Sequence, residues 1–89
     1  MPRPAITGKV QQVYVDAPNC YACVQIGPTP SNVEACPVFH TTGGQVDDDI
    51  HLAYKNSILA AALAALANGL PISVHFDNEG YIANLTITA

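Results

Sequence analysis

The sequence predicts a small, mainly β domain of five strands with one α-helix between the third and fourth. Five short segments are rich in β-branched and aromatic residues, and Gly-, Pro- and Asn-rich turn signals separate them. One long apolar stretch of helical character lies between the third and fourth segments. A ferredoxin-like fold needs a second helix, and no other stretch could supply it. This order of elements is that of an OB-fold barrel, a fold that commonly binds oligonucleotides or oligosaccharides.

The predicted strands are bounded by turn residues. Gly8 interrupts the first strand and predicts a bulge or a sharp bend there. Pro37 confines part of the third strand to a sheet edge or a bulge, because proline cannot donate to a ladder. The five strands are expected at residues 5–15, 20–26, 33–41, 70–76 and 81–88.

The predicted helix covers about residues 48–68. The carboxylates of Asp47, Asp48 and Asp49 suit its N-terminus, and Asn68-Gly69 suits its end. Residues 58–67 are all apolar, but about ten such residues are too few to cross a bilayer, which needs roughly twenty. We therefore expect no membrane insertion, and we expect the helix to pack on its own domain with one side and on other copies with the other. The expected interface residues are Ile58, Ala62, Ala65 and Leu66.

Chain length, composition and net charge limit the classes of function that fit this sequence. The 89 residues make one domain, 1–89, with 49% hydrophobic and only 11% charged residues, which indicates subunit contacts. Three Lys/Arg against seven Asp/Glu give a net charge of -4, so no basic stripe can neutralise phosphates and nucleic acid is not an expected partner. No apolar run precedes Lys9, so no signal peptide is visible; a mature or trimmed chain and an intracellular one both fit.

No constellation of residues predicts catalysis. Cys20-x-x-Cys23 and Cys36-x-x-x-His40 have zinc-like spacing, but along a strand Cys36 and His40 would be about 13 Å apart at about 3.3 Å per residue. The acidic triplet lacks the alternating ligands of a calcium loop. His40, His51 and His75 are unlinked, and no nucleophile motif is present. We therefore expect no enzyme activity, no metal and no cofactor.

Four segments of the chain stand out together: I-T-G-K-V at residues 6–10, Tyr21-Ala22-Cys23, Ala35-Cys36 and N-S-I-L-A-A-A-L-A-A-L-A-N-G-L-P-I-S-V-H-F at residues 56–76. With these segments the chain resembles the pentamer-forming binding subunits of bacterial toxins of the subtilase-cytotoxin and pertussis-like kind. The resemblance implies a secreted OB-fold subunit in a ring of five, with its helix along a central pore and its outer face binding glycans that end in sialic acid. It also implies a separate catalytic partner subunit.

The resemblance also points to particular residues. It implies a Cys23–Cys36 disulfide between the second and third strands, against the alternative of reduced thiols used as small core residues. Thr7 matches the position of a hydroxyl that contacts sialic acid, and an ordinary strand residue is the alternative. Lys9, Glu34 and Tyr81 are candidates for the same glycan site through their chemistry alone: a cation, a carboxylate and a stacking ring. A structural assembly module without a small-molecule ligand is the alternative function.

Overall fold

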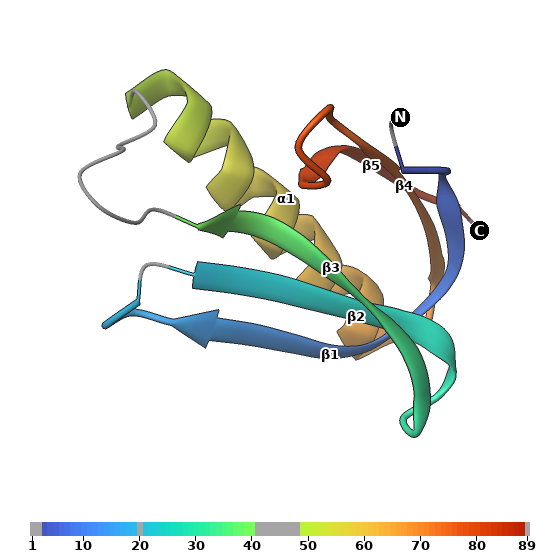
Figure 1. Ribbon diagram of the computed structural model, residues 1–89. Coiled ribbons are helices and arrows are strands. Elements are labelled where there is room, and N and C mark those ends of the chain that lie inside the picture. Colours follow the sequence, from blue (N-terminus) through green and yellow to red (C-terminus); the bar gives the residue numbers. More distant parts are fainter. Residues whose placement is uncertain (1–2, 20, 41–48, 89) are drawn as a thin grey trace.

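The computed structural model describes residues 3–19, 21–40 and 49–88 of the chain (Figure 1). Within these ranges, five strands and one helix follow one another, and the helix lies between the third and fourth strands, which confirms the mainly β prediction. The elements are β1 (Ile6–Asp16), β2 (Tyr21–Thr29), β3 (Asn32–His40), α1 (Asp49–Asn68), β4 (Pro71–Phe76) and β5 (Ile82–Ile87).

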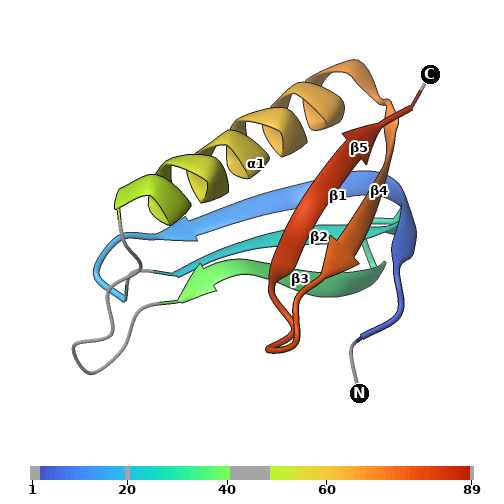
Figure 2. The ribbon, with the colours of Figure 1, turned by 90° about the horizontal axis from the view of Figure 1, so that it is seen from above.

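The strands form one open antiparallel sheet in the order β3-β2-β1-β4-β5. The first part of β1 pairs with β4 and the rest pairs with β2, so this strand joins two halves of the sheet. Figure 2 shows β4 and β5 crossing the direction of β1, β2 and β3 steeply, which leaves the sheet strongly curved. The described residues do not close into the expected five-stranded barrel, because β3 and β5 approach each other without sharing a hydrogen-bonded ladder.

A β-bulge in β1 changes which side chains point outward. The register with β2 shifts between Val10 and Gln12, and the extra residue, Gln11, donates a side-chain hydrogen bond to the Gly27 carbonyl oxygen at 2.8 Å. The sequence predicted a bulge or bend at Gly8, and the bulge lies three residues later. Gly8 instead allows a close approach, because a Cβ there would lie 3.1 Å from the Ile26 side chain.

The core lies between α1 and the concave side of the curved sheet. The helix contacts β1, β3, β4 and β5, and its apolar side chains meet those of the strands. Figure 2 shows α1 lying along one side of β1. The buried cluster consists of Val10, Ala22, Val24, Ile26, Cys36, Val38, Leu59, Ala62, Ala65, Ile72, Val74, Phe76 and Ile82.

The structure corrects the expected oligomer interface on the helix. Ala62 and Ala65 are 0% and 1% exposed and belong to the core of their own domain, so they are not available to another copy. Ile58 is half-buried against the same core, whereas Leu66 is 37% exposed. The helix ends as predicted at Asn68, and the following Gly69 closes it with a φ of 65°. The Leu70 N–H donates to the Ala65 carbonyl at 3.0 Å.

The Cys23–Cys36 disulfide implied by the resemblance does not form, and both thiols are free and buried. A second register shift, between β2 and β3, places Cys23 opposite Pro37 and Cys36 opposite Val24. Since Cys23 and Val24 are successive strand residues, the two cysteine side chains point to opposite faces of the sheet. Burial raises the pKa of the Cys36 thiol to about 11, so it is an inert core residue. Cys20 lies outside the described residues.

Candidate functional site

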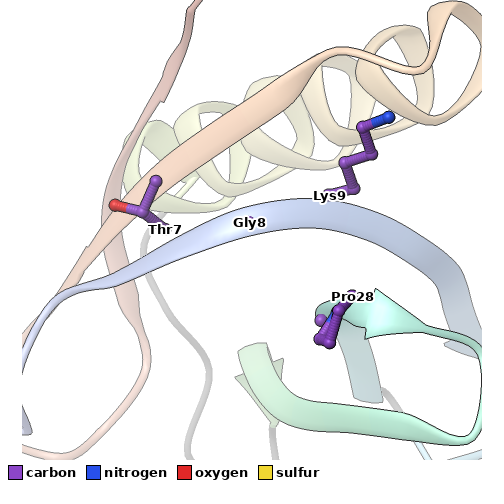
Figure 3. A pocket seen from close by; sticks show the side chains of 5 residues that line it. Thr7, Gly8, Lys9 and Pro28 are labelled. Atoms are coloured by element: carbon purple, nitrogen blue, oxygen red, sulfur yellow. The ribbon is translucent and has the colours of Figure 1, made fainter.

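The candidate site is a shallow groove of about 400 Å³ between β1 and the end of β2 (Figure 3). Its lining residues are Thr7, Gly8, Lys9, Gly27 and Pro28. Thr7 and Lys9 are two residues apart in one strand, so both project from the side of β1 that faces away from the core. The groove therefore brings together two of the four residues that the sequence proposed for a glycan site.

Gly27 allows β2 and β3 to approach each other closely at one wall of the groove. A Cβ at this position would collide with the carbonyl oxygen of Asn32 and lie 2.8 Å from the Cα of Val33, both in the backbone of β3. Only glycine permits so close an approach of two backbones. The Gly27 carbonyl also accepts the hydrogen bond from Gln11, so the bulge in β1 and the groove wall are fixed to each other.

Two hydroxyl groups lie side by side at one end of the groove. Thr7 is paired with Ser73 of β4, and its hydroxyl donates to the Ser73 Oγ at 3.2 Å. Both residues are at least partly exposed, so their remaining lone pairs and the Ser73 hydroxyl proton are open to a ligand. This end of the groove can exchange hydrogen bonds with the hydroxyl groups of a bound molecule.

Lys9 supplies a cation that no described residue neutralises. The chain has three Lys/Arg residues in all. Arg3 pairs with Glu34 at 3.6 Å and stacks over Phe76, and Lys55 pairs with Asp77 at 3.9 Å and donates to the Ile82 carbonyl at 2.9 Å. Within residues 3–19, 21–40 and 49–88, the ammonium of Lys9 has no such partner. Lys9 is exposed and lines the groove, and its side chain extends from β1 away from Pro28 (Figure 3). An anionic ligand is the chemistry that fits it.

The other two candidates lie elsewhere. Glu34 is occupied by its ion pair with Arg3, and Tyr81 lies next to β5 with its ring centroid 5.7 Å from the Lys55 ammonium. Neither side chain lines the groove. Sequence reasoning missed Ser73 and Pro28, because only the pairing of β1 with β4 and β2 brings them beside Thr7 and Lys9.

The described residues hold no cluster of three His, Cys, Asp or Glu side chains that could bind a metal ion. His75 Nδ1 lies 3.0 Å from the amide oxygen of Asn84 in an exposed pair across β4 and β5. The side chains of His40, His51 and the acidic triplet Asp47–Asp49 lie outside what the structure describes. Over the described part of the chain, no helix is both long and apolar enough to cross a membrane.

Comparisons with protein-family models, with curated proteins and with solved structures find no match to this chain. The resemblance to toxin binding subunits therefore rests on the sequence segments alone, and the function has to be argued from the groove and the surface.

Proposed function

We propose that this chain is a non-catalytic, self-associating subunit that binds an acidic carbohydrate in the groove between β1 and β2. The observation that carries the proposal is Lys9, the cation that lies at the groove and pairs with no other described residue. Its ammonium would pair with the carboxylate of an acidic sugar such as sialic acid. The hydroxyls of Thr7 and Ser73 would bind sugar hydroxyls at the other end.

The arrangement of the elements supports an OB-like fold for such a subunit. The helix follows the third strand, β1 pairs with both β2 and β4, and β3 comes near β5 at the two edges of the curved sheet. These are the relations expected in a five-stranded, partly open Greek-key barrel, a fold used for oligosaccharide binding. Since fold does not determine function, the groove chemistry remains the main argument.

We expect the sialic acid of a small glycan to decide whether it binds. A trisaccharide that ends in sialic acid should bind, and the disaccharide without the sialic acid should bind at least several-fold more weakly. Lys9→Gln should weaken binding of the trisaccharide by about 1 kcal/mol, roughly fivefold, because the ion pair is exposed. Isothermal titration at low salt measures both constants.

Two control variants separate charge from shape. Lys9→Arg keeps the cation and should retain most of the affinity, and Thr7→Val removes the hydroxyl while keeping a β-branched side chain. Equal binding of the two glycans, or unchanged affinity in Lys9→Gln, would remove the basis of the proposal.

The surface of the helix supports self-association. We define the apolar helix face as the exposed residues Ala60, Leu63, Ala64, Leu66 and Ala67. Leu63 is 52% exposed, and no charged residue occurs between Asn56 and Asn68, so two copies could approach here without like charges meeting. A ring of five copies is the number that the toxin resemblance implies. A secreted location and a separate catalytic partner subunit are proposed on the same resemblance.

Leu63→Gln should reduce the solution mass from that of an oligomer to that of one chain. The substitution places an amide in the apolar helix face, where a neighbouring copy would bury it without partners. Light scattering on a size-exclusion column measures the mass. Ile87→Gln is the matched control, because Ile87 is also an exposed apolar side chain but lies on β5. A monomeric native chain would contradict self-association.

A structural assembly module without a small-molecule ligand is the second candidate function. The exposed apolar helix face favours it independently of the groove. A stable oligomer that binds none of the acidic or neutral glycans tested would support this function over carbohydrate binding.

A further inference from the structure

A pair of tyrosines forms an aromatic surface at the far end of β1 from the groove. The ring centroids of Tyr14 and Tyr21 are 6.2 Å apart and the rings are tilted by 55°. Tyr14 lies opposite Cys23, and Tyr21 lies opposite Asp16, so both rings are on the outer face of the β1–β2 hairpin, away from the core. The Tyr14 side chain is exposed, with 43% of its surface accessible, although it takes part in ordered contacts.

Asp16 and Asn19 form a hydrogen-bonded group at the hydroxyl end of the Tyr14 ring. One carboxylate oxygen of Asp16 accepts hydrogen bonds from the Tyr14 hydroxyl at 3.1 Å and from the side-chain amide of Asn19 at 2.7 Å. Its other oxygen accepts from the Asn19 backbone N–H at 3.3 Å. The hydrogen bonds from Asn19 and Tyr14 lower the pKa of Asp16, so the carboxylate is ionised at neutral pH.

Tyr21 lies beside the exposed ring of Tyr14 and is more buried than it. Its side chain is half-buried next to Cys23, which is only 4% exposed. The contact with Cys23 and burial raise the pKa of Tyr21 to about 12, so its hydroxyl is neutral at physiological pH. One small outer surface therefore carries two aromatic rings, a carboxylate acceptor and an amide donor. These groups belong to Tyr21, Tyr14, Asp16 and Asn19.

We propose that Tyr14, Tyr21, Asp16 and Asn19 form a second sugar-binding site, one that takes a neutral hexose. The C–H face of the sugar stacks on the open ring of Tyr14, and its hydroxyls donate to Asp16 and accept from the Asn19 amide. Asp16 disfavours any anionic ligand, including nucleic acid and acidic sugars. The site is thus opposite in charge preference to the groove at Lys9 and does not depend on it.

A matched pair of monosaccharides tests the charge preference. Methyl β-galactoside is the neutral probe, since its axial hydroxyl leaves one continuous C–H face for stacking. Methyl β-galacturonide has a carboxylate in place of the hydroxymethyl group. In protein-detected NMR titrations, the neutral probe should shift the signals of Tyr14, Asp16 and Asn19, and the acidic probe should bind there at least several-fold more weakly. Asp16→Asn should narrow this difference, because it removes the charge and keeps a hydrogen-bonding group.

Variants at Tyr14 test the stacking. Tyr14→Ala should weaken binding of the neutral probe about tenfold, whereas Tyr14→Phe keeps the ring and should lose less. Lys9→Gln should leave this binding unchanged, so failure at one site can be told apart from failure at the other.

Three outcomes would overturn the proposal: no shift at these residues up to saturating probe, equal affinity of Tyr14→Ala and the native chain, or equal binding of the acidic and neutral probes. A change in solution mass in Tyr14→Ala, without any effect of sugar, would assign the surface to contact with a second copy. Should Tyr14→Ala fail to fold, Tyr14→Phe and Asp16→Asn still give the comparison.

Discussion

Ala62→Glu is expected to leave the chain largely unfolded. The Ala62 side chain is 0% exposed and packs in the core between α1 and the sheet. A glutamate there must enter a space that holds only a methyl group, and it must bury a carboxylate that has no partner. Overpacking costs about 1–3 kcal/mol and an unpaired buried charge several more, against a total of about 5–15 kcal/mol for a whole domain. Circular dichroism and urea unfolding would measure the loss.

Ala53→Glu is the matched control for this experiment. It places the same side chain on the same helix, but Ala53 is exposed and lies outside the apolar helix face. Its free energy of unfolding should stay within about 0.5 kcal/mol of the native value. If Ala62→Glu instead folded as stably as Ala53→Glu and only lost its oligomeric state, the original assignment of Ala62 to an interface between copies would be restored.

Gly27→Ala is expected to destabilise the chain by more than about 2 kcal/mol, because the added Cβ collides with the backbone of β3 rather than with a side chain. Backbone atoms in a paired strand cannot move aside without breaking the ladder between β2 and β3. Gly27 is not in a left-handed conformation, so alanine itself is tolerated there and the loss comes from the collision alone. Urea unfolding measures the change.

Gly8→Ala separates this collision from a general effect of losing glycine. Its Cβ would meet the end of the Ile26 side chain at 3.1 Å, and a side-chain methyl can shift by a few tenths of an ångström. The expected loss is about 1 kcal/mol. Similar losses in both variants would show that the approach of β2 to β3 at Gly27 is looser than the structure indicates. In Gly27→Ala the groove wall also moves, so any glycan binding should fall with stability.

The order of strands and helix was predictable because local patterns encode it. Turn residues and β-branched runs mark each strand, and glycine at position 69 marks the end of the helix. The open form of the sheet could not be predicted, because it depends on whether β3 and β5 pair, and these strands are far apart in sequence. The disulfide inference failed for a similar reason, because a register shift in β2 and β3 decides which face each cysteine takes.

The buried side of the helix could not be read from the sequence. Residues 58–67 consist only of isoleucine, leucine and alanine, so no polar residue in this stretch marks the exposed face of the helix. Packing decides instead, and it selects Leu59, Ala62 and Ala65 for the core while Leu63 and Leu66 stay outside.

Only some of the residues that line the candidate groove could be predicted from the sequence. Two residues of one strand share a face, so Thr7 and Lys9 were certain to lie near each other if that segment was a strand. Glu34 and Tyr81 were candidates through their chemistry alone. The arrangement of the strands instead brings Ser73 of β4 and Pro28 of β2 close to Thr7 and Lys9.

The extra residue in β1 limits how this surface can change during evolution. Lys9 and Tyr14 are an odd number of positions apart, and in a regular strand they would face opposite sides of the sheet. The bulge at Gln11 restores the alternation, so the groove and the tyrosine pair lie on the same outer side of one strand. Losing one residue between them would leave a spacing of four, and a regular strand without the bulge would then keep both surfaces outward. Losing a second residue, with no bulge to compensate, would turn one of the two surfaces inward, whereas substitutions of the outward side chains can accumulate one at a time.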